Sequence, residues 1–318
     1  PAGGRALPRR GRVPQTELRR LDVLTAERGR WQVRGHRLDL HGLDDVVLPG
    51  RRGEPPVTVR ELVRYHAEVA PVLLAHLADR PVEVVRRPDN RGSASDDLVA
   101  AAPGWMTRWT DPDSGERRLV LGEPAALAWV ASQGGVELHP SVAVADEPAA
   151  PTWVVVEIRP GRVTSPSDVT LLGGLHRTAL DHLGLAGGVK DDGRGGLEVW
   201  IPVASGPSFT DATAWAADLA RSIGASVPEL VRGASPSRGR DERARLVHRQ
   251  TAMRPHVVVP YGVVAHRGGP VSIPLDWDEL DDPAALGRRT LRDVPSRLAT
   301  VGDPFAPLLG MGQELPPL

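Results

Sequence analysis

The pattern of apolar and polar positions is clearest in the middle of the chain. Residues 153–158 read Trp-Val-Val-Val-Glu-Ile, an apolar run that is typical of a buried strand. Because side chains alternate across a strand, Glu157 and Arg159 lie on the same face of it. A Ser-Pro-Ser-Asp start and the apolar spacing after it predict a helix over 169–183 that ends at Gly184.

Two further strands follow this helix. One reaches Lys190, the other covers 197–203, and the glycine-rich stretch 191–196 between them predicts a turn. The result is a strand–helix–strand–turn–strand unit whose polar side chains come together at the turn.

The rest of the chain continues the mixed pattern. Thr58, with Glu61 three residues later, predicts a capping box at the start of an amphipathic helix. The other predicted elements are a hairpin over 31–40, helices over 124–133 and 211–223, and strands over 117–121, 244–248 and 256–264.

Composition narrows the class of protein. The 318 residues are 41% hydrophobic and 25% charged, which is ordinary for a globular protein. The absence of cysteine excludes disulfides and thiolate metal sites, and no apolar run is long enough to span a membrane, so the expected location is the cytoplasm. A net charge of −1 argues against a strong general DNA binder, and the bias toward Arg, Ala, Gly and Pro is typical of a high-GC genome.

The central unit resembles a known family. The archaeo-eukaryotic primase superfamily, and within it the polymerase domain of bacterial DNA ligase D, has an apolar strand that ends Asp-x-Asp-Pro and then a glycine-rich Lys-to-Pro loop. Here Pro160, Lys190, Gly193 and Gly196 fall in register with those motifs. The resemblance covers about residues 31–309. It implies an α/β (α+β) primase-polymerase fold with an RRM-like central β-sheet flanked by helices.

The residues that this family uses for catalysis are replaced. Its two metal-binding aspartates correspond to Glu157 and Arg159, its loop hydroxyl to Asp192 and its loop histidine to Glu198. The third aspartate corresponds to Val247 or His248.

The resemblance also implies changes outside this site. The family lysine that contacts the 5′-phosphate of a DNA end corresponds to Asp45, and a second family lysine at a helix start corresponds to Val59, with Arg60 next door. His139 lies in the segment most similar to the family, where a structural role in a turn is favoured over a catalytic one.

Two-metal phosphoryl transfer needs several carboxylates around two cations, and Arg159 puts a fixed positive charge where a cation would lie. We therefore expect a catalytically inactive relative, not an enzyme, that is a binding or accessory module in DNA end-joining or repair and needs no cofactor. Its partners would be DNA ends or repair proteins such as a ligase or Ku.

Two alternatives stay open. Glu157, Asp191, Asp192 and Glu198 could form a rebuilt site that binds Mn²⁺ or Mg²⁺ with a nucleoside triphosphate, although Asp-Asp before glycine is also common in solvated turns. The second alternative is a protein-interaction scaffold unrelated to DNA. A basic groove would argue for nucleic acid, and its candidate residues are Arg86, Arg194, Arg240 and Arg245.

The domain organisation follows from the same patterns. Residues 1–28 are rich in Pro, Gly and Arg and are expected to be a basic tail. The tail could be solvated, could contain a short helix near 15–25, or could be an arm that contacts nucleic acid or a partner. Residues 29–318 are expected to form a single primase-polymerase-like domain.

Overall fold

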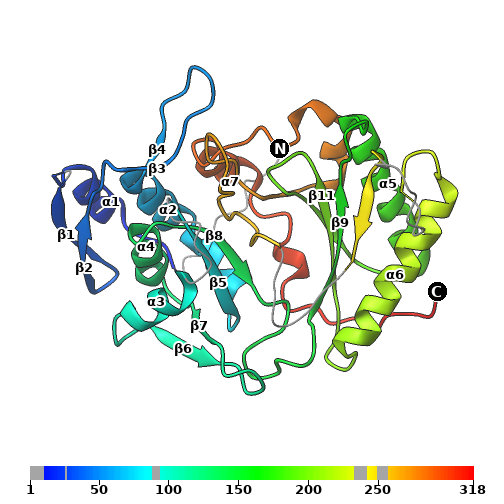
Figure 1. Ribbon diagram of the computed structural model, residues 1–318, viewed down its shortest axis with the longest axis horizontal. Helices are drawn as coiled ribbons and strands as arrows, with labels where there is room; N and C mark the ends of the chain where they lie inside the picture. Colours follow the sequence, from blue (N-terminus) through cyan, green and yellow to red (C-terminus); the bar gives the residue numbers. More distant parts are fainter. Residues whose placement is uncertain (1–10, 26, 88–93, 233–241, 249–256) are drawn as a thin grey trace. The chain divides into compact units, whose positions relative to one another are not determined.

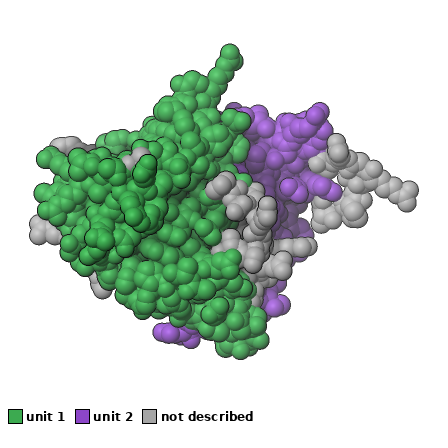
Figure 2. Space-filling view, turned by 60° about the vertical axis from the view of Figure 1, so that its left-hand side comes forward, with its two compact units in different colours: residues 1–141, 257–272, 289–303 green, residues 142–256, 273–288, 304–318 purple. Residues whose placement is uncertain are grey.

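The chain forms two compact units. The computed structural model describes residues 11–25, 27–87, 94–232, 242–248 and 257–318. Unit 1 comprises residues 1–141, 257–272 and 289–303, and unit 2 comprises residues 142–256, 273–288 and 304–318 (Figure 2). No helix within the described ranges is both long and apolar enough to cross a bilayer.

Unit 1 contains two small two-stranded sheets and a four-stranded antiparallel sheet in the order β6-β7-β5-β8. Its helices α2 and α4 pack on each other, and α1 packs on α2 (Figure 1). The helices are α1 (Gln15–Asp22), α2 (Val59–Leu77), α3 (Ala94–Ala101), α4 (Pro124–Ser132) and α7 (Val294–Val301). The strands are β1 (Arg28–Val33), β2 (His36–His41), β3 (Val46–Leu48), β4 (Val57–Thr58), β5 (Pro81–Arg86), β6 (Thr107–Thr110), β7 (Arg117–Val120) and β8 (Gly135–Pro140).

Helix α1 lies inside the segment that was predicted as a tail. Its residues Leu18 and Leu21 are buried, as is the facing Trp31 of β1. Burial of these side chains removes apolar surface from water and holds the helix against the unit. The short helix is therefore confirmed, while the division into a tail over 1–28 and one domain over 29–318 stays a prediction.

The start of α2 corrects one detail. The Thr58 hydroxyl accepts a hydrogen bond from the Glu61 backbone N–H at 3.3 Å, as predicted. The second half of the expected capping box does not form, because the Glu61 carboxylate pairs with Arg292 at 2.6 Å. A distant arginine is thus the partner of this carboxylate, which local sequence cannot indicate.

Unit 2 is built on a five-stranded antiparallel sheet in the order β12-β9-β11-β10-β13. Its elements are β9 (Trp153–Arg159), α5 (Pro166–Leu183), β10 (Gly188–Asp191), β11 (Leu197–Pro202), α6 (Phe209–Ser226), β12 (Arg245–Val247), β13 (Ile273–Leu275) and 3-10 helices η1 (Trp277–Asp281), η2 (Pro283–Ala285) and η3 (Ala306–Leu308). The first six form a β-α-β-β-α-β sequence of the split βαβ kind, with β13 added at one edge. The predicted RRM-like central sheet is confirmed.

The two faces of this sheet have different neighbours. Helices α5 and α6 lie against one face (Figure 1), where the fully buried Ile158 and Leu197 are cross-strand partners. Residues one position away point to the opposite face. That face carries Trp153 and Trp200, whose ring centroids lie 5.5 Å apart, with Phe305 packed against both.

One predicted strand is wrong. Residues 257–264, the described part of the expected strand over 256–264, form turns and a single isolated bridge between Val263 and Val271. Tyr261 has a φ of +68°, which is uncommon for a side chain of this size. Its N–H donates to the Ser272 carbonyl at 2.7 Å and its hydroxyl to Asp303 at 2.9 Å, so long-range contacts hold this backbone.

Gly188 gives a test of packing in unit 2. A Cβ at this position would overlap the Phe305 ring, whereas a Cβ at Gly174 of α5 would meet nothing within 4 Å. We expect Gly188→Ala to lower the free energy of unfolding by about 1–3 kcal/mol through overpacking. Gly174→Ala should raise it by about 0.5–1 kcal/mol, since alanine favours a helix interior. Urea unfolding of both variants checks this, and equal stabilities would contradict the packing described.

Candidate functional site

The candidate site is a row of side chains across the face of the unit 2 sheet opposite to α5 and α6. The register pairs Lys190 with Glu198, Glu198 with Glu157, and Glu157 with Val247. Residues directly opposite each other in an antiparallel sheet share a face, so these four form one line over β10, β11, β9 and β12. Arg159, two residues beyond Glu157, lies on the same face.

Lys190 and Glu198 form a buried ion pair. The Lys190 Nζ lies 2.8 Å from Glu198 Oε2, and the two side chains are 0% and 5% exposed. Trp200 donates its indole N–H to the same carboxylate at 2.8 Å, and Lys190 also lies over the Trp200 ring. Burial raises the pKa of Glu198 above its ordinary value, and the charge of Lys190 opposes that rise.

Glu157 is paired in the same way with Arg159. Arg159 Nη2 and Nε lie 2.6 Å and 2.8 Å from Glu157 Oε2. Burial raises the pKa of Glu157, while the charges of Arg159 and Lys190 work against the rise. The row has two cations, Lys190 and Arg159, and two carboxylates, Glu157 and Glu198, so its net charge is zero.

Asp191 and Asp192 stabilise the glycine-rich turn. The Asp191 carboxylate accepts the N–H groups of Gly193 at 2.8 Å and Gly287 at 2.7 Å. The Asp192 carboxylate accepts the N–H groups of Arg194 at 2.6 Å and Gly196 at 2.9 Å. Side chains that bond backbone N–H groups two or more residues ahead stabilise turns, so the structure places both in the turn role that the sequence left open.

The family's metal does not fit this arrangement. Asp191 pairs with Leu197, which puts it on the helix-covered face, away from Glu157 and Glu198. Within the described ranges, no group of three or more His, Asp or Glu side chains is placed to hold a metal ion. The four carboxylates proposed for a rebuilt site are thus divided between two faces and bonded to other partners.

Backbone geometry explains why two positions of the turn are glycine. Gly193 has a φ of +75°, in the left-handed region that favours glycine. A Cβ on Gly196 would lie 2.5 Å from Asp192 Oδ2 and 2.7 Å from the Ile158 carbonyl. The geometry of the fold therefore requires glycine at both positions.

The two positions compared with the family's third aspartate are Val247 and His248. Val247 lies opposite Glu157, whereas His248 lies just beyond the end of β12. The row therefore has an apolar side chain at this point. His248, named as a candidate from the sequence, lines a groove between β12 and α6.

His139 belongs to unit 1 and has a carboxylate partner. Its Nε2 lies 2.9 Å from Glu137 Oε2, and Glu137 Oε1 accepts the backbone N–H of Ala265 at 2.7 Å. Both side chains are buried on β8. Together the two link β8 to the chain near Ala265, which supports the structural role expected for His139.

The predicted basic residues are divided between the two units. Arg86 in unit 1 donates from Nε to the Gln133 carbonyl at 2.8 Å. In unit 2, Arg194 is exposed on the turn, and Arg245 is exposed on β12 opposite Arg159. Arg240 lies outside the described residues.

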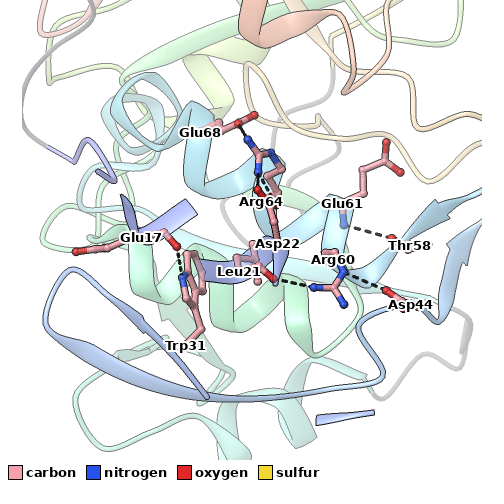
Figure 3. Close-up of polar contacts among 10 residues, drawn as sticks. All are labelled: Glu17, Leu21, Asp22, Trp31, Asp44, Thr58, Arg60, Glu61, Arg64 and Glu68. Atoms are coloured by element: carbon pink, nitrogen blue, oxygen red, sulfur yellow. Dashed lines mark hydrogen bonds and ion pairs between the residues drawn. The ribbon is translucent and has the colours of Figure 1, made fainter. Parts of the chain in front are cut away.

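Asp45 and Val59 are the positions compared with family lysines, and contacts of the neighbouring Arg60 are drawn in Figure 3. Asp45 is exposed and Val59 is buried. Arg60 donates to Asp44 at 3.0 Å, to the Leu21 carbonyl at 2.7 Å and to the Leu24 carbonyl at 3.0 Å. All three of its nitrogens therefore point at protein groups around the C-terminal end of α1, where a cation is stabilising.

Arg64 strengthens the same contact between α1 and α2. It pairs with Asp22 of α1 at 2.5 Å and with Glu68 of its own helix at 2.9 Å (Figure 3). The hydrogen bond to Asp22 raises the pKa of Arg64. The basic residues at this start of α2 thus serve contacts within unit 1.

Sequence reasoning missed the partners of Glu198. The signal was present, because a hairpin whose turn is centred on Arg194 places Lys190 directly opposite Glu198 when residues are counted outward from the turn. Trp200, two residues further along β11, then shares the face of both side chains.

Comparison with known proteins agrees with this fold. A family model described as LigD, primase-polymerase domain, matches residues 58–305. The fold and the matched family model define a domain of the primase-polymerase class. The chain belongs to the LigD primase-polymerase domain family.

Curated relatives match this chain at 27% identity. The chain is 27% identical to the multifunctional non-homologous end joining protein LigD of Mycolicibacterium smegmatis, over 86% of this chain and 36% of that protein. It is 27% identical to LigD of Pseudomonas aeruginosa over 80% of this chain and 31% of that protein. The chain thus spans about a third of the length of the curated relatives it matches.

A solved structure shares the fold. The polymerase domain of Mycobacterium tuberculosis Ligase D, solved in complex with DNA, superposes with a TM-score of 0.75 at 24% identity. The match covers 87% of this chain and 99% of that one. At this identity the likeness establishes the fold.

The buried ion pair between Lys190 and Glu198 leads to a prediction about stability. Lys190→Met leaves the Glu198 carboxylate buried without its cation, and we expect a loss of about 3–5 kcal/mol in the free energy of unfolding. The double variant Lys190→Met/Glu198→Gln should recover most of this, because both charges are gone and the amide oxygen still accepts from Trp200.

The pH dependence separates these two variants. Removal of Lys190 raises the pKa of Glu198 in the folded protein further, so the folded state binds a proton more tightly than the unfolded state. Stability of Lys190→Met should then fall as pH rises above the ordinary carboxyl pKa, and the double variant should lack this fall. Urea unfolding at several pH values measures it, and parallel pH profiles would contradict the pairing.

Proposed function

We propose that this chain is a LigD-family primase-polymerase domain without nucleotidyl-transfer activity. It acts as a binding or accessory module in DNA end-joining or repair. The observation that carries the proposal is the Arg159–Glu157 ion pair, which puts a guanidinium at the position of a metal-binding aspartate. A guanidinium is protonated at all accessible pH values, so it repels a divalent cation.

The electrostatics of the row support the same conclusion. Two-metal catalysis needs carboxylates that together compensate two divalent cations. Here Glu157 is already compensated by Arg159, and Glu198 by Lys190. A metal ion would have to displace a protein cation at each carboxylate.

The partner class follows from the family and from the surface. The solved relative is a complex with DNA, and the curated relatives are end-joining proteins. In this chain Asp45 and Val59 stand at the positions compared with two family lysines, and Arg60 bonds Asp44 and the carbonyls of Leu21 and Leu24. We therefore favour repair proteins, such as a ligase or Ku, over a 5′-phosphate as the primary partner, with DNA ends as the second candidate.

Calorimetry with Mn²⁺, and then with a nucleoside triphosphate in the presence of Mn²⁺, tests this proposal. We expect no binding of Mn²⁺ to the wild-type row. Arg159→Asp serves as the matched variant, because it replaces the repelling cation by a carboxylate beside Glu157 and should raise the affinity for Mn²⁺ at least about tenfold, roughly 1.4 kcal/mol.

A primer-extension assay completes the test. Template-dependent nucleotide addition by the wild-type chain that disappears in Glu157→Ala would overturn the proposal. Mn²⁺ binding that disappears in Asp192→Ala or Glu198→Ala would instead indicate the rebuilt carboxylate site. Circular dichroism of each variant shows whether the fold is intact.

A further inference from the structure

A groove lies in unit 2 between helix α6 and the edge strand β12. Its volume is ≈ 740 Å³, within the range of protein ligand sites. Ala217, Ala220 and Gly224 of α6 line one side, and Leu246 and Val247 of β12 line the other. The small side chains of α6 leave room for an additional segment beside the strand. The groove shares β12 with the row described above, but its lining includes none of the charged residues of that row.

Strand β12 is at the end of the sheet. It pairs with β9 on one side and is the last strand in the order of the described sheet. The segment near Val231 bonds to the residue before β12, with the Arg232 N–H donating to the Ala244 carbonyl at 2.8 Å. Edge strands carry backbone N–H and C=O groups that pair with an added strand.

The rim of the groove is cationic. Arg221, Arg232, Arg245 and His248 line it, and the described lining residues include no Asp or Glu. Arg221 is paired with the exposed Asp218 at 2.7 Å. The side chains of Arg232 and Arg245 make no ion pair or hydrogen bond with any other part of the chain that the structure describes. Unpaired guanidinium groups bind carboxylates or phosphates through two parallel hydrogen bonds.

The floor of the groove distinguishes between these two anions. Single-stranded nucleic acids are held by aromatic side chains on which the bases stack. The described lining has no aromatic side chain apart from the His248 ring, and its floor is aliphatic. An aliphatic floor with a cationic rim beside β12, the last strand of the described sheet, fits an extended peptide whose side chains alternate between aliphatic and acidic.

We propose that this groove binds an extended acidic segment of a partner protein as an additional strand on β12. Alternate side chains of the segment point into the floor of Ala217, Ala220 and Leu246, and its carboxylates pair with Arg232 and Arg245. This inference rests on the proposed function in that it names the chemistry of the partner that an accessory module would bind.

Fluorescence anisotropy with a labelled peptide of alternating glutamate and valine tests the proposal. The wild-type chain should bind it, and should bind the same peptide with lysine in place of glutamate at least about tenfold more weakly. Arg245→Glu should weaken binding of the acidic peptide at least about tenfold, because it reverses a charge on the rim. Ala217→Leu should also weaken it, by filling the floor without changing the charge.

Arg177→Glu is the matched control. Arg177 is an exposed arginine of unit 2 on α5, outside the groove, so the same change of charge there should leave binding within about twofold of wild type. Equal effects of Arg245→Glu and Arg177→Glu would reduce the interaction to general charge attraction and overturn the proposal. Absence of binding at about 1 mM peptide would overturn it as well.

An oligothymidylate of similar length tests the alternative ligand, a single-stranded nucleic acid. If it binds in an Arg245-dependent manner while the peptide does not, the groove is a nucleic-acid site and the proposal is wrong. The assay uses neither nucleotide nor metal, so its failure is distinct from a failure of the proposed function, which the extension assay detects. Unchanged urea unfolding of Arg245→Glu confirms that the variant is folded.

Discussion

The buried ion pair between Lys190 and Glu198 is the interaction on which the candidate site depends. Taking two charges out of water is costly, and a pair at 2.8 Å with an added indole donor offsets that cost only when every group is in position. The pairing fixes the register of β10 and β11, and therefore the turn between them. It also determines which side chains lie beside Glu157, since the next partner across the sheet is Glu198.

Two carboxylates directly opposite each other in a sheet repel, and Glu157 and Glu198 are such a pair. In this chain a protein cation lies at each end of the pair, Lys190 beyond Glu198 and Arg159 beside Glu157. The sheet thus supplies its own counter-ions. A sheet without these two cations would need positive charge from another source to hold the two carboxylates side by side.

Much of unit 2 could be predicted from sequence because its elements are set by local signals. The helix over α5 has a capping box at Ser165 and a left-handed glycine at Gly184, and both were visible in the chain. The strand expected over 256–264 failed because Tyr261 takes a positive φ that distant partners hold, among them Asp303. The role of Arg60 could not be predicted from sequence for the same reason. It donates to the carbonyls of Leu21 and Leu24, at and just beyond the end of α1, about forty residues away in sequence.

The frame of the site and its chemistry are under different physical constraints. Gly193 and Gly196 are required by a positive φ and by the close approach of the Ile158 carbonyl, whatever the sheet binds. Asp192 bonds the backbone of that same turn, so a carboxylate there is explained by the turn alone. A family motif can therefore persist in a chain because the fold needs it. Evidence for activity has to come from groups that the fold does not need, and in this row those groups are paired with each other.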